Sequence, residues 1–67
     1  MTKTFTVVIQ QEDDWYVASC VENNVASQGK TIDDAIINLR EAVALYYQDE
    51  PIPIFHPAFV TTLEVAI

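Results

Sequence analysis

Basic residues are scarce in this chain. Against ten Asp and Glu residues there are only Lys3, Lys30 and Arg40, so the formal net charge at pH 7 is −7. Nucleic-acid-binding proteins neutralise phosphates with clustered Lys and Arg, and no segment here gathers enough of them. The composition therefore predicts no direct nucleic-acid binding. It favours a partner with a basic surface, because opposite charges speed the encounter of two proteins.

Cysteine, histidine and glycine each occur once. Cys20 alone excludes an internal disulfide, and Cys20 with His56 supplies too few ligands for a zinc site, so we expect no metal and no cofactor. We expect Cys20 to be buried as a small apolar residue, since acidic surroundings do not favour a thiolate. His56 is expected to be packed or solvated. A single glycine is no phosphate-binding loop, and we expect Gly29 to supply backbone freedom.

Long apolar runs are also lacking. None approaches the roughly 18 residues that a membrane span needs, and the first residues lead into a strand pattern rather than a signal core. We therefore expect a cytoplasmic protein without membrane contacts, forming a single domain over residues 1–67. A domain this small buries only about 60% of the surface that its unfolded chain exposes. Because 51% of the residues are hydrophobic, we also expect a homo-oligomer, a dimer or a tetramer.

Apolar residues that alternate with polar ones predict three strands. The first covers residues 4–10 and the second residues 15–21, separated by a polar break of hairpin length, so these two strands should pair antiparallel. Residues 22–24 form the next turn, because Asn tolerates left-handed backbone angles. A short third strand follows over residues 25–28.

The apolar period changes to that of a helix after Thr31. Apolar residues then recur every three or four positions up to Tyr46. Thr31 is placed to cap this helix by accepting the amide of Asp34, whose negative charge suits the first turn. We expect the helix to end near Gln48, because Pro51 disfavours helical geometry at the residue before it.

The remaining residues predict a proline-rich connector over residues 51–57 and a fourth strand over residues 59–67. The element order β-β-β-α-β is typical of an α+β domain with two layers. We expect one helix packed on a mixed four-stranded sheet, in which the last strand lies parallel to the first through a right-handed crossover.

Three features together resemble the HicB antitoxin-like family. They are the aromatic start of the second strand (residues 15–18), the step Ser27-Gln28-Gly29-Lys30-Thr31, and the helix opening Asp33-Asp34-Ala35 with Glu41-Ala42 further on. The resemblance implies a partial ribonuclease-H-like fold, without the DNA-binding C-terminal domain that many members carry. It also implies the antitoxin half of a toxin–antitoxin system, whose usual partner is a HicA-type toxin, a small basic ribonuclease.

The acidic and hydroxyl residues do not favour a catalytic interpretation. A two-metal nuclease needs carboxylates converging from the first strand, the helix and the last strand, yet residues 5–10 contain none and Glu41 with Glu64 do not complete a site. Ser27 and Thr31 lack a suitably oriented base. We therefore expect no enzymatic activity and interpret the acidic cluster at residues 12–14 as a solvated hairpin tip.

The sequence thus predicts a non-catalytic HicB-like antitoxin that binds and neutralises a small basic toxin. Its candidate partner-binding residues are Glu12, Asp13, Asp14, Trp15 and Glu22. Trp15 is equally compatible with packing at a sheet edge. The alternative is an orphan oligomeric sensor or scaffold domain that has the same fold and no toxin partner.

Overall fold

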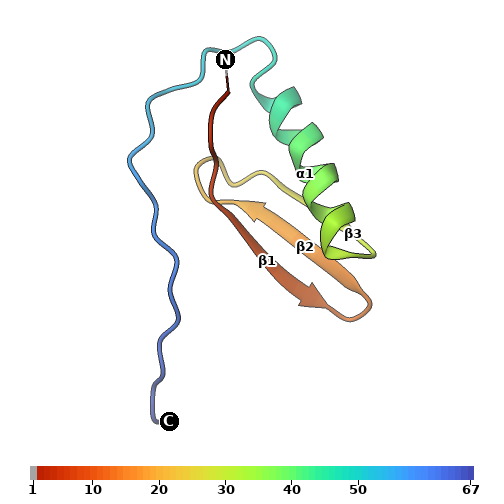
Figure 1. The fold of residues 1–67 in the computed structure, drawn as a ribbon, viewed down its shortest axis with the longest axis vertical. Coiled ribbons are helices and arrows are strands. Elements are labelled where there is room, and N and C mark those ends of the chain that lie inside the picture. Colours follow the sequence, from red (N-terminus) through yellow and green to blue (C-terminus); the bar gives the residue numbers. More distant parts are fainter. Residues whose placement is uncertain (1) are drawn as a thin grey trace.

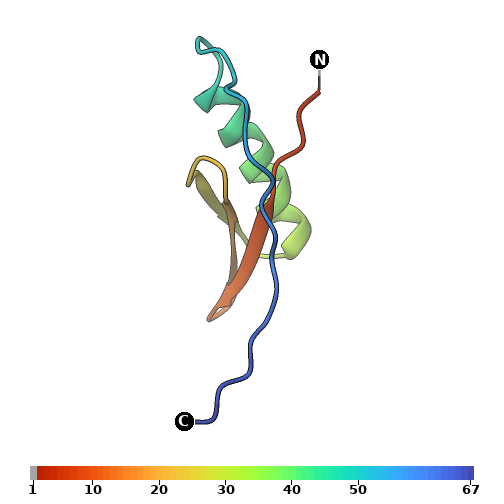
Figure 2. The same ribbon diagram turned by 90° about the vertical axis from the view of Figure 1, so that its left-hand side faces the viewer.

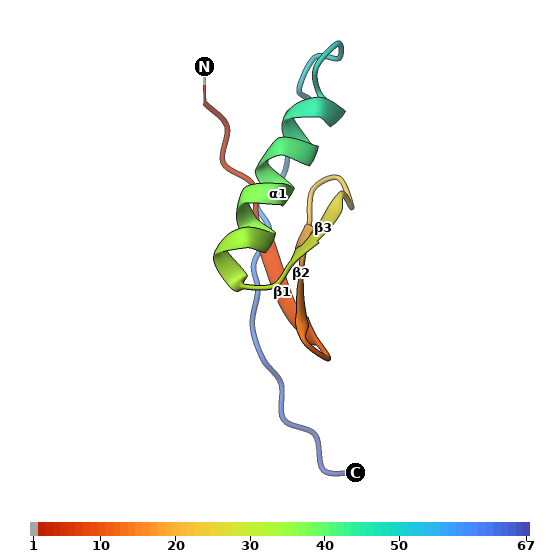
Figure 3. The ribbon, with the colours of Figure 1, turned by 90° about the vertical axis from the view of Figure 1, so that its right-hand side faces the viewer.

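The protein folds as one helix packed across a three-stranded antiparallel sheet, followed by an extended segment (Figure 1). A computed structural model describes residues 2–67. Strands β1 (Val7–Glu12), β2 (Trp15–Cys20) and β3 (Ala26–Gly29) lie in the sheet in sequence order, and helix α1 (Ile32–Tyr46) covers one face (Figure 3). The predicted α+β class and the two layers are confirmed.

The β1–β2 hairpin is tighter than predicted. Its register pairs Val7 with Cys20 and Glu12 with Trp15, which leaves a loop of only Asp13 and Asp14. Asp13 adopts a φ of 53°, the left-handed geometry that two-residue hairpin loops require. β1 therefore begins three residues later than predicted and continues two residues further, because polar side chains are tolerated where a strand is exposed.

The other boundaries shift by one or two residues. The turn before β3 does use a left-handed asparagine, Asn24, with a φ of 62°. α1 ends at Tyr46, two residues earlier than predicted, and Tyr47 caps it. The Tyr47 ring stacks on Phe5, with ring centres 5.8 Å apart.

The core lies between α1 and the inner face of the sheet. Five side chains are buried, Ala18, Cys20, Ala35, Leu39 and Val43, and half-buried apolar residues that include Phe5, Ile9 and Tyr16 pack around them. The buried helix positions are four residues apart, which is the spacing of one helical face. This core is small, as expected for so short a chain.

The predicted mixed four-stranded sheet is not confirmed. Residues 59–67 form no strand, and the sheet ends at β1 on that side. After α1 the chain returns past Phe55, whose ring lies 5.6 Å from that of Phe5 and 6.4 Å from that of Tyr47. Three prolines, two before Phe55 and one after it, keep the connector extended. The segment then runs on outside the sheet in broadly the same direction as β1 (Figure 1). The predicted partial ribonuclease-H-like fold, which includes a fourth strand, is therefore not confirmed either.

Candidate functional site

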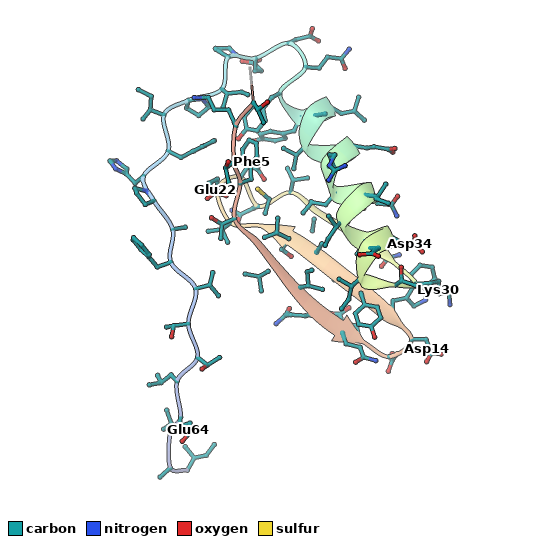
Figure 4. All side chains as sticks on the ribbon, viewed as in Figure 1. Phe5, Asp14, Glu22, Lys30, Asp34 and Glu64 are labelled. Carbon is teal, nitrogen blue, oxygen red and sulfur yellow. The ribbon has the colours of Figure 1, made fainter. Side chains whose placement is uncertain are left out.

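The hairpin tip and the start of α1 lie at the same end of the domain (Figure 4). The sheet register brings them together, because Tyr16 at the start of β2 pairs with Gly29 at the end of β3, two residues before the helix cap. Five exposed carboxylates gather there, and we call them the acidic end: Glu12, Asp13, Asp14, Asp33 and Asp34.

The helix cap fixes the positions of Asp33 and Asp34 in the acidic end. Thr31 has extended backbone angles, and its Oγ1 accepts a hydrogen bond of 3.0 Å from the backbone N–H of Asp34, as predicted. Both aspartates then sit in the first turn, where the helix dipole favours negative charge. The Asn38 side chain adds a tie to the sheet by donating to the carbonyl oxygen of Gln28 at 2.8 Å.

The structural role of Gly29 differs from the predicted one. It has no positive φ, so backbone freedom is not its role. A Cβ at this position would lie 2.6 Å from the Ala35 nitrogen and 2.8 Å from the Asp34 carbonyl carbon. The expectation of conformational freedom was wrong, and the requirement is close approach of β3 to the first turn of α1.

Trp15 and Lys30 contact each other beside the acidic end. The Lys30 Nζ lies 4.2 Å from the centre of the Trp15 ring, a cation–π contact worth about 0.5–1 kcal/mol at an exposed site. The Trp15 side chain remains 39% exposed. Sequence reasoning missed Lys30 and Asp33 as neighbours of the hairpin tip. The register of β2 with β3 would have identified them, because it pairs Tyr16 with Gly29 and so places the start of β2 beside Lys30.

Glu22 lies apart from the other predicted partner-binding residues. Figure 4 places it beside Phe5, at the opposite end of the hairpin from Asp14. Its Oε1 accepts a hydrogen bond of 2.8 Å from the Thr6 backbone N–H, and that bond holds the pKa of the Glu22 carboxyl below its usual value. The five predicted residues thus do not form one surface: four lie at the hairpin tip, and Glu22 pins the chain before β1 to the turn after β2.

Cys20 is buried, as predicted, with 1% of its surface exposed. Its Sγ lies 3.6 Å from the same Glu22 oxygen. Burial raises the pKa of the Cys20 thiol, and the nearby carboxylate raises it further. The thiol is therefore a poor nucleophile at neutral pH.

An apolar groove opens between α1 and the outer side of β1. It encloses about 470 Å³ and is lined by apolar side chains of Phe5, Val7, Ile36, Leu39 and Val43. Two of the three basic residues of the chain, Lys3 and Arg40, also line it. The groove thus differs in character from the acidic end: it is apolar, with positive charge beside it.

Within residues 2–67, no three His, Cys, Asp or Glu side chains are grouped so that they could hold a metal ion. In the same residues, no helix combines the length and the apolar character needed to cross a bilayer.

Comparison with known proteins places the chain in a family. No curated protein and no solved structure matches it significantly. A family of unknown function, DUF7387, matches residues 3–64, a stretch that includes the sheet, the helix and most of the extended segment. The chain therefore belongs to the DUF7387 family.

Proposed function

We propose that this protein is an antitoxin-like binding module that covers a small basic ribonuclease of the HicA type and blocks its access to RNA. The observation that carries the proposal is the acidic end. Five exposed carboxylates and one lysine converge there from two elements of the fold, in a chain whose net charge is −7. A surface of this kind steers a cationic partner toward one orientation.

The residues that resemble HicB antitoxins build this same end. The Ser27–Thr31 step ends β3, contributes the close-packed Gly29 and caps α1, and Trp15 opens β2 beneath Lys30. The resemblance and the charge thus point to the same surface. In this proposal Trp15 is the apolar anchor of the contact, because aromatic residues ringed by polar groups are frequent hot spots.

The proposed module has no catalytic role and acts in the cytoplasm, where a ribonuclease toxin meets its RNA. The first test is growth of cells that express the candidate toxin, a basic protein of about 60–80 residues encoded beside this chain, with and without this protein. Rescue of growth together with co-purification of the pair is the expected result. Failure of both would contradict the proposal.

The second test locates the contact. The double variant Asp13→Asn, Asp14→Asn removes two charges from the hairpin tip, and Asn tolerates the left-handed geometry of residue 13. The matched control Asp49→Asn, Glu50→Gln removes two charges just after α1, so both proteins have the same net charge. We expect the tip variant to slow association with the toxin at least about threefold at low salt, and the control to have a smaller effect. Equal effects would show that net charge matters and the tip does not.

The second candidate function is an oligomeric scaffold or sensor without a toxin partner. Its support is the apolar groove beside β1 and the exposed apolar side chains of the extended segment, which no antitoxin role requires. Absence of a basic neighbouring protein, together with a stable homo-oligomer, would favour this candidate.

A further inference from the structure

β1 forms an open edge of the sheet. It pairs with β2 on one side, and on its other side no described residue continues the ladder. The N–H and C=O groups of that edge are free to accept another strand. Val7, whose side chain faces the groove from this strand, is 38% exposed.

The segment 58–67 has the composition of a strand and no partner. Phe59, Leu63 and Val65 lie two or four residues apart, so they share one face of an extended chain, and they are 92%, 84% and 65% exposed. The segment contains one charged residue, Glu64, on the opposite face. An alternating β-branched and aromatic segment of this length is typical of a strand half-buried in a sheet.

The groove lies between α1 and the open edge of β1, where a fourth strand would cover it. A strand added at the β1 edge places every second side chain against α1, where Ile36, Leu39 and Val43 line the groove. Lys3 and Arg40 beside the groove disfavour a basic occupant such as the proposed toxin. An almost uncharged apolar strand with one acidic residue is suited to it, and segment 58–67 is such a strand.

The direction of the segment indicates which copy supplies it. Within one chain, the ring contacts of Phe55 hold the connector beside Phe5 and Tyr47. The segment then runs along the outer side of β1 without joining the ladder (Figure 1 and Figure 2). It runs in broadly the same direction as its own β1. In a second copy related by a two-fold axis across the strands this direction is reversed, so that copy's segment meets this β1 antiparallel, the stronger ladder geometry.

We propose that two copies of this chain exchange segments 58–67, each segment adding to the β1 edge of the other copy as an antiparallel fourth strand. The stiff proline connector favours exchange, because it holds the segment away from its own edge. The exchange completes the sheet of both copies and covers both grooves. The exchange does not rest on the proposed antitoxin role, because it is argued from the open β1 edge and the groove and not from the charges of the acidic end.

The first test is oligomeric state by light scattering at micromolar protein. The wild-type chain should have the mass of a dimer. Leu63→Lys and Val65→Lys place a charge on the apolar face of the segment and should raise the dimer dissociation constant at least about 100-fold, because each dimer loses two buried side chains. The matched control Thr62→Lys adds the same charge on the opposite face and should leave the dimer intact. A monomeric wild type, or a dimer unaffected by Leu63→Lys, would overturn the proposal.

The second test identifies the contacting segments. One chain carries Val8→Cys, on the face of β1 turned away from α1, and a second, tagged chain carries Thr62→Cys. Cys20 is kept in both chains, because it is buried and unreactive. A short bis-maleimide should link the two chains in the mixture. The double variant in a single chain, diluted below dimer formation, should stay unlinked. A link within one chain would show that the segment pairs with its own β1.

Discussion

Replacement of Gly29 by alanine should destabilise this domain through the joint between β3 and α1. The added Cβ would lie 2.6 Å from the Ala35 nitrogen, whereas ordinary contacts begin at 3.4 Å, so the joint must open by about 0.8 Å. Two of the three nearest atoms belong to the helix backbone, which cannot turn aside as a side chain can. Overpacking of this kind costs about 1–3 kcal/mol, and the rigid neighbours place Gly29→Ala at the upper end of that range.

A loss of 2–3 kcal/mol is a large part of the stability of so small a domain, which is about 3–10 kcal/mol for 67 residues. Thermal unfolding followed by circular dichroism at one fixed protein concentration should show a Tm lowered by about 10–20 °C. The matched control is Gln28→Ala, an exposed neighbour in the same strand that keeps its backbone carbonyl for Asn38. Gly29→Asn separates the two explanations, because Asn would be tolerated if left-handed geometry were the requirement. A Tm for Gly29→Ala within about 2 °C of wild type would refute the steric reasoning.

Four further outcomes follow from single contacts. Thr31→Ala should lower the free energy of unfolding by about 1 kcal/mol, measured by urea unfolding, because the helix loses its capping hydroxyl. Thr31→Ser should leave the free energy of unfolding nearly unchanged, because the serine hydroxyl also caps a helix. Glu22→Gln should lower the Tm at neutral pH. It should also make the decrease of Tm with falling pH smaller than in the wild type. The depressed pKa of Glu22 gives stability that is present above its ordinary value of 4.5 and is lost as the pH falls through the folded-state pKa. Cys20 should react with a thiol reagent no faster than the protein unfolds, with immediate reaction in denaturant as the control. Phe55→Ala should speed proteolysis of the connector while leaving α1 protected, since its ring contacts tie the connector to Phe5 and Tyr47.

Local chemistry was enough to predict the three strands of the sheet and the helix. The Thr31 cap, the left-handed Asn24, the buried Cys20 and the helical stripe all depend on residues close in sequence, and all are present in the structure. The role of Gly29 was missed because it depends on how closely a strand approaches a helix, which no local pattern reveals. The length of β1 was missed because a two-residue loop at Asp13 leaves polar residues in the strand.

The candidate site and the fourth strand depend on contacts between distant segments. The composition predicted an acidic partner-binding surface, but only the register of β2 with β3 brings the hairpin tip beside Lys30 and the first turn of α1. Glu22 is similar in type to the acids of the tip, and nothing in its neighbours along the sequence distinguishes its structural role. The pattern of residues 59–67 indicates a strand, but a pattern in one chain does not specify which chain provides the edge that it pairs with.

The contact between Lys30 and Trp15 makes the acidic end visible to spectroscopy. Trp15 is the only tryptophan of the chain, it is half-exposed, and its ring is covered on one side by an ammonium group. Its fluorescence therefore reports on the environment of one end of the molecule, without any label. A partner that docks on the hairpin tip displaces water from the indole and changes the emission. An exchange of strands at the β1 edge covers a groove that Trp15 does not line and leaves its contact with Lys30 in place. We therefore expect a smaller change of emission from the exchange than from docking at the tip.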